Sequence, residues 1–150
     1  MPAKKTEKES DGFSADERAA MKERAAELRA EGKKGAKRAD GLRAVLDRIA
    51  EMVPEDRALA ERVHVAVTAT APELSPKTWY GMPAYANADG KVVVFFQDAA
   101  KFKFRYSTLG FQEAANLDDD DDMWPVSYAL VKWSPAVDKK VVELVKTAIS

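Results

Sequence analysis

A chain of 150 residues, 46% hydrophobic and 33% charged, has the size and composition of one soluble globular domain. The absence of cysteine excludes disulfides, thiol catalysis and thiolate metal sites, and a single histidine excludes sites that need two imidazoles. A formal net charge of -1 at pH 7 argues against a dedicated nucleic-acid binder. No apolar run approaches the roughly 20 residues of a membrane-spanning helix, so we expect a cytoplasmic protein without a membrane partner.

The N-terminal part is expected to stand apart from the domain. Residues 1–12 are charged and poor in large apolar side chains, which predicts a disordered tail. Ser14 and Glu17 form a capping box, and the helix that it predicts carries a thin apolar stripe of Met21, Ala25 and Leu28. So narrow a stripe favours an arm laid on the domain.

A glycine-rich basic segment follows this arm. Residues 32–38 hold two glycines and four cations, a composition that ends a helix and favours a linker. Their spacing lacks the pattern of a phosphate-binding loop. We therefore assign arm and linker to residues 13–40 and the main α+β domain to residues 41–150.

Two amphipathic helices are expected before the sheet. Asp40 can cap the first, whose apolar face contains Leu42, Val45, Leu46, Ile49 and Val53. Pro54 suits the first turn of the second, whose stripe contains Leu59, Val63, Ala66, Val67 and Thr70. Glu61 and His64 on that helix have the spacing of two metal ligands, but a carboxylate-bridged site needs a second such pair. A histidine at the edge of the core is the favoured interpretation.

The segment 77–106, KTWYGMPAYANADGKVVVFFQDAAKFKFRY, predicts a small meandering antiparallel sheet. The turn residues 87–90 should join strands at 83–86 and 91–97 into a hairpin. In 101–106, apolar Phe102, Phe104 and Tyr106 alternate with Lys101, Lys103 and Arg105, which predicts a third strand with a cationic ladder on its solvent face.

The C-terminal part supplies the remaining elements. We expect a short helix at 109–115, a last strand at 127–133, and a helix opened by Ser134 and Pro135 that closes on the sheet. The fold class predicted is α+β: four to five antiparallel strands, helices on one face, and an N-terminal helical arm.

Five consecutive aspartates, residues 118–122, must be solvated unless a cation neutralises them. Their spacing does not fit a calcium loop of the EF-hand type, so a charged surface loop is favoured. The alternative is weak binding of a hard cation by Asp118, Asp120 and Asp122.

The motif W-Y-G-M-P-A-Y at 79–85, followed by D-G-K-V-V-V-F-F, resembles the YdhG-like domain family, small bacterial proteins of unknown function. The resemblance covers roughly Leu59 to Ile149, and the arm resembles an extension found in one branch of the family. Some members carry an iron-chaperone label through a frataxin-like fold. The resemblance therefore implies this fold and, as one function, iron handling by surface carboxylates.

The same motif predicts a binding cleft on physical grounds. Gly81 permits a bend, Pro83 suits a sheet edge, and tyrosine and tryptophan offer apolar faces with a polar handle. We expect this cleft to be bordered by Trp79, Tyr80, Met82 and Tyr85, with Trp124 on its rim. Lys101, Lys103 or Arg105 would attract an anionic group. The alternative is that the rings only fill the core and the cations only face solvent.

No pair of residues has the spacing of a catalytic constellation, so we do not expect an enzyme. The function predicted is a non-catalytic intracellular binding module for a small molecule or a protein partner, without a cofactor. The alternative is a frataxin-like iron chaperone that binds the metal weakly.

Overall fold

Five antiparallel strands form one sheet, in the order in which they occur along the chain. The computed structural model describes residues 14–32 and 38–150, so the predicted disordered tail and most of the basic linker lie outside the described residues. The helices are α2 (Ala15–Gly32), α3 (Arg38–Ala50), α4 (Pro54–Thr70), α5 (Ala99–Phe102) and α6 (Pro135–Ala148). The strands are β1 (Ser75–Trp79), β2 (Met82–Ala86), β3 (Val92–Gln97), β4 (Ser107–Phe111) and β5 (Ser127–Leu130). The predicted α+β class is confirmed.

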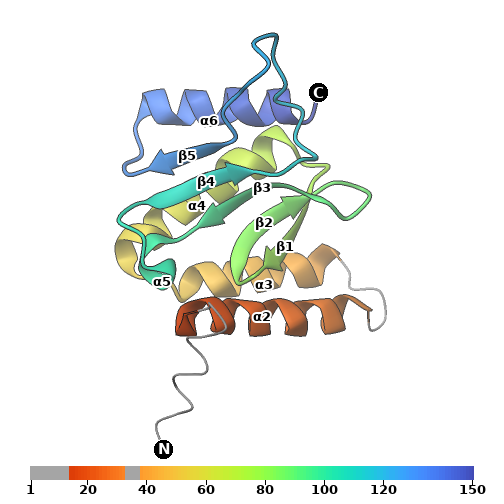
Figure 1. Cartoon of the computed structure of the whole chain (residues 1–150), viewed down its shortest axis with the longest axis vertical. Helices are drawn as coiled ribbons and strands as arrows, with labels where there is room; N and C mark the ends of the chain where they lie inside the picture. Colours follow the sequence, from red (N-terminus) through yellow and green to blue (C-terminus); the bar gives the residue numbers. More distant parts are fainter. Residues whose placement is uncertain (1–13, 33–37) are drawn as a thin grey trace, which may run out of the picture.

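The core lies between one face of the sheet and the helices α3, α4 and α6. Val63 and Val67 of α4, Val145 of α6 and Val45 of α3 are fully buried in one cluster with Phe96 and Leu109 of the sheet. In Figure 1 the sheet stands in front of α4, while α3 and α2 run beside its β1 edge. None of the helices in the described ranges is long and apolar enough to cross a membrane.

Local signals at the helix ends are confirmed. The Ser14 hydroxyl accepts the Glu17 amide at 3.0 Å and the Glu17 carboxylate accepts the Ser14 amide at 2.9 Å, which is the predicted capping box. The Ser134 side chain accepts the Val137 amide at the start of α6. Pro54 opens α4 in its first turn, as predicted.

The apolar face predicted for the helix at 40–53 is only partly buried. Val45 and Ile49 enter the core, whereas Leu42, Leu46 and Val53 are exposed. The reason is that α3 lies directly on the backbone of β1: a Cβ at Gly41 would collide with the Pro76 carbonyl. So close an approach leaves a narrow interface, with room for few side chains.

The predicted strand at 101–106 is wrong. Residues 99–102 form the single helical turn α5, and Lys103, at φ 60, ends it in the left-handed conformation. The strand that pairs with β3 is β4, at 107–111, where we expected the start of a short helix. The alternation of rings and cations therefore lies in a connection and not along a strand.

The helix-free face of the sheet carries two aromatic rings in edge-on contact, those of Trp79 and Phe95. Cross-strand pairs place Ala84, Phe95 and Gly110 in one row on this face. The Phe95 ring lies over Gly110, where an added Cβ would collide with it, and packs edge-on against Trp79 at 5.3 Å between centroids. The predicted β2–β3 hairpin is confirmed, with Gly90 at φ 79 in its turn.

Candidate functional site

The turn between β1 and β2 has a strained backbone. Trp79 and Met82 pair across the hairpin, which leaves Tyr80 at φ 55 and Gly81 at φ 79 as its two central residues. A two-residue turn with both φ values positive fits the twist of the strands but favours Asn-Gly. A tyrosine in the left-handed region costs free energy and is retained only where its surroundings hold it.

A carboxylate of α2 binds the backbone of this turn. The Tyr80 amide donates to Glu27 Oε1 at 3.1 Å, and the Gly81 amide donates to Glu27 Oε2 at 3.2 Å. Successive N–H groups in a turn form a concavity that attracts anions. Arg24, one turn earlier on α2, donates to the same carboxylate at 3.3 Å. The turn is thus an anion site that a side chain of the same chain fills.

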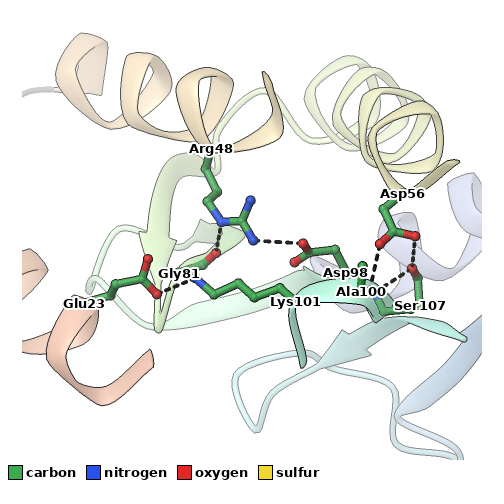
Figure 2. Close-up of polar contacts among 9 residues, drawn as sticks. Glu23, Arg48, Asp56, Gly81, Asp98, Ala100, Lys101 and Ser107 are labelled. Atoms are coloured by element: carbon green, nitrogen blue, oxygen red, sulfur yellow. Dashed lines mark hydrogen bonds and ion pairs between the residues drawn. The ribbon is translucent and has the colours of Figure 1, made fainter. Parts of the chain in front are cut away.

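A second carboxylate lies directly on Gly81. The Lys101 ammonium donates to Glu23 Oε1, and a Cβ at Gly81 would collide with both groups (Figure 2). Only glycine therefore fits this position, first for its φ and second for the ion pair above it. Lys101, predicted to attract an anionic group of a ligand, is paired in the structure with a carboxylate of the chain itself.

The docked face of α2 is polar. Lys103 Nζ lies 3.5 Å from Asp16, and the Arg24 guanidinium stands 5.9 Å from the centroid of the Tyr80 ring. Met21 and Leu28 of the thin apolar stripe are 44% and 52% exposed, so the stripe buries little area, as its narrowness predicts, and α2 docks through another face. Ala20, which is buried, turns toward the domain together with Glu23 and Glu27.

Arg48 of α3 binds the turn through its guanidinium group. Its Nε donates to the Gly81 carbonyl at 2.7 Å and its Nη2 to Asp98 Oδ2 at 2.8 Å (Figure 2). Both side chains are buried. Asp98 Oδ1 has no hydrogen-bond partner within the described part of the chain. Sequence reasoning missed Arg48; the available signal was its place between Val45 and Ile49 on the buried face of the helix.

A second buried carboxylate fixes the segment that carries Lys101. Asp56 Oδ2 accepts the Ala100 amide at 2.9 Å, and Asp56 Oδ1 accepts the Ser107 hydroxyl at 3.4 Å. The Ser107 hydroxyl in turn accepts the Ala99 amide at 3.1 Å. The amides of Ala99 and Ala100 are the first of α5 and have no acceptor inside a single helical turn, so these bonds stabilise helix over residues 99–102, into the start of the predicted strand.

The predicted cleft residues divide between two faces of the sheet. Trp79 and Met82 lie on the helix-free face, and Tyr80 is 37% exposed beside α2. Tyr85 lies on the opposite, core face, where it is buried and shares a 2.8 Å hydrogen bond with Nδ1 of His64. Burial raises the pKa of the Tyr85 hydroxyl and lowers the pKa of His64. Tyr85 therefore belongs to the core and not to a ligand surface.

The other predicted residues lie apart from the turn. Arg105 is exposed and stacks over Tyr106 at 5.1 Å. Trp124 precedes β5 at the far edge of the sheet, where it lines a pocket of about 290 Å³ to which none of the Y-G-M-P-A-Y residues contributes. The structure thus joins Tyr80, Gly81, Lys101 and Lys103 with α2, and leaves Trp124 and Arg105 outside this group.

The aspartates predicted as metal ligands form an exposed loop. Asp119 accepts the amide of Asp121 at 2.9 Å, and Asp122 has φ 62. In the ranges 14–32 and 38–150, no three histidine, aspartate or glutamate side chains are grouped so that they could hold a metal ion. Glu61 pairs with Arg57. Iron binding by Asp118, Asp120 and Asp122 stays a prediction from the sequence.

Fold and site together define an α+β domain with an anion-binding turn that its own N-terminal helix covers. Comparison of the chain with known protein families, with curated protein sequences and with solved structures finds no match. The resemblance to the YdhG-like family therefore rests on the sequence motif alone.

Proposed function

We propose that this chain is a non-catalytic binding module whose β1–β2 turn recognises an acidic group of a partner. The observation that carries the proposal is the bidentate seat of Glu27 on the Tyr80 and Gly81 amides. Two fixed N–H groups beside a lysine ammonium bind any carboxylate of similar geometry, because the interaction depends only on the charge and the shape of the bound group. In this proposal α2 is an internal occupant that the partner replaces.

The way α2 docks supports replacement. Its contacts with the domain are mainly ionic, through Asp16, Glu23 and Glu27. The Lys103–Asp16 pair is exposed, and pairs of this kind contribute only about 0–1 kcal/mol and are screened by salt. With Met21 and Leu28 left exposed, little apolar surface opposes release of the helix. A partner with the same charges can therefore displace α2 from the turn at a modest cost in free energy.

The occupant also indicates the class of partner. Glu23 and Glu27 are one helical turn apart, and this spacing satisfies Lys101 and the turn amides at once. An acidic helix of another protein, with two carboxylates four residues apart, meets the same groups in the same way. We propose such a helix as the ligand and the cytoplasm as the compartment, the latter on the sequence alone.

The test uses the full chain and a peptide of residues 14–32 as the probe. A Glu23→Gln/Glu27→Gln variant keeps α2 but removes both charges, so the labelled peptide should bind it several-fold more tightly than the wild type in fluorescence anisotropy. This gain in affinity should decrease with added salt, and it should be absent for a peptide with glutamine in place of both Glu23 and Glu27.

Glu113→Gln serves as the matched control, since it removes one exposed carboxylate far from the turn. This variant should bind the peptide as weakly as the wild type does. Equal binding of the charged and the neutral peptide would overturn the proposal. Full competition by acetate at the same concentration as the peptide would reassign the site to a small anion and reject the helical partner.

The iron-chaperone alternative remains a prediction from the sequence, because no contact in the described residues favours it over the binding module.

A further inference from the structure

A pocket of about 290 Å³ lies at the sheet edge opposite to the β1–β2 turn, between α6, β5 and the loop that precedes β5. Its apolar wall is formed by Leu117, Leu144 and the rings of Trp124 and Tyr128. The volume lies just below the range typical of small-molecule sites, which is roughly 300–1,000 Å³. The pocket therefore fits a small ligand.

The rings of this pocket are held in place by the core. Tyr128 packs edge-on against Phe111 with 6.3 Å between centroids, and Trp124 is partly buried against the core cluster. Burial raises the pKa of the Tyr128 hydroxyl, so the ring stays neutral over the physiological range. Ring faces fixed in this way attract cations through their quadrupole.

A cation of the chain already uses one of these rings. The Lys140 ammonium stands 5.7 Å from the centroid of the Tyr128 ring. Asp119 and Glu143 bring two carboxylates to the same pocket, and in the described part of the chain neither forms an ion pair with Lys140. The pocket thus has negative charge in excess, aromatic faces, and the exposed side chain of Lys140 as its present cation.

We propose that this pocket binds a small organic cation, an ammonium group on a short apolar body. The cationic group lies against the Tyr128 and Trp124 rings in place of Lys140, and Asp119 and Glu143 compensate its charge. The apolar body contacts Leu117 and Leu144. This second site prefers the charge opposite to that of the β1–β2 turn, and it does not depend on the function proposed for the turn.

The experiment is an NMR titration of the full-length protein with tert-butylammonium chloride, at constant ionic strength. The neutral alcohol tert-butanol has the same apolar group and serves as the matched probe. The ammonium should shift the Trp124 indole N–H and the Tyr128 amide to saturation, whereas the alcohol leaves them in place. Equal shifts with both probes would reduce the pocket to an apolar crevice and overturn the proposal.

Substitutions of Glu143 and Lys140 test how the pocket recognises the cation. Both side chains are exposed, so their replacement leaves the core intact. Glu143→Gln should weaken binding of tert-butylammonium several-fold, because a compensating charge is lost. Lys140→Gln should strengthen it several-fold, because the internal competitor is removed. If Lys140→Gln weakens binding, or if acetate saturates the wild-type pocket, Lys140 recognises an anion and the proposal is wrong.

Discussion

The guanidinium of Arg48 and the carboxylate of Asp98 form a buried ion pair with 2.8 Å between Nη2 and Oδ2, although the two residues lie 50 positions apart in the chain. Since Arg48 also binds the Gly81 carbonyl, this pair joins α3, the β1–β2 turn and the start of α5. Buried pairs of this kind stabilise less by their own attraction than by the penalty that follows when one partner is lost.

Replacing Arg48 should therefore be costly. Arg48→Met leaves Asp98 charged and buried, and we expect the free energy of unfolding to fall by about 3–5 kcal/mol, measured by urea denaturation. The double variant Arg48→Met/Asp98→Leu should recover much of this loss. Arg57→Met is the control, because its pair with Glu61 is half exposed and should contribute about 0.5 kcal/mol at most. Similar losses at positions 48 and 57 would contradict this account.

Substitutions at two glycines with the same φ can distinguish the effect of backbone strain from the effect of the contact with α2. Gly81 and Gly90 both have φ +79, but nothing lies within 4 Å of a Cβ at Gly90, whereas a Cβ at Gly81 collides with Glu23 and Lys101. Gly90→Ala should cost about 1–2 kcal/mol through strain alone. Gly81→Ala should cost more and should accelerate hydrogen exchange of the α2 amides, which Gly90→Ala leaves unchanged. Faster exchange in both variants would disprove a specific seat for α2.

His64 should make stability depend on pH. Burial lowers its pKa from the ordinary 6.5, so the folded state binds fewer protons than the unfolded state. The free energy of unfolding should thus fall as the pH drops from above 6.5 to the lowered folded-state pKa, and then level off. In His64→Gln this part of the pH profile should disappear, as followed by thermal unfolding at a series of pH values. A profile unchanged by the substitution would assign the pH dependence to carboxylates.

Ferrous iron, if it binds, should bind weakly and at the aspartate loop. The triple variant with asparagine at 118, 120 and 122 should lose this binding in anaerobic calorimetry, because the loop gathers the charge. His64→Ala should retain it, since Nδ1 of His64 is engaged with Tyr85. Tight binding that only the histidine variant loses would place the metal elsewhere.

Local signals were sufficient for most of the fold. The capping box at Ser14, the proline at 54 and the turn around Gly90 each act through neighbouring residues, and each predicted the correct element. The strand predicted at 101–106 is wrong because the chain enters this segment in a helical turn, and Asp56, which binds the Ala100 amide in that turn, lies 44 residues away from it. Alternation of rings and cations carries no information about such a distant acceptor.

The candidate site was only half visible in the sequence. Gly81 predicted the bend from local chemistry, whereas Lys101 was expected to attract an anionic group of a ligand and not a carboxylate of this chain. The carboxylate that fills the bend belongs to Glu27, 53 positions before Tyr80, and it lies on a helix whose apolar residues suggested another docking face. A helix that docks through charges has no hydrophobic periodicity to reveal its orientation.

The contact between the Phe95 ring and Gly110 makes these two positions thermodynamically one unit. A methyl group at 110 forces the ring away, and a small side chain at 95 uncovers the backbone of β4, so each change alone is unfavourable. Made together, the changes should cost less than their sum, because the methyl then fills space that the ring has left. During evolution, alanine at 110 is thus expected to occur together with a smaller side chain at 95. Trp79 would then lose its edge-on contact with the Phe95 ring.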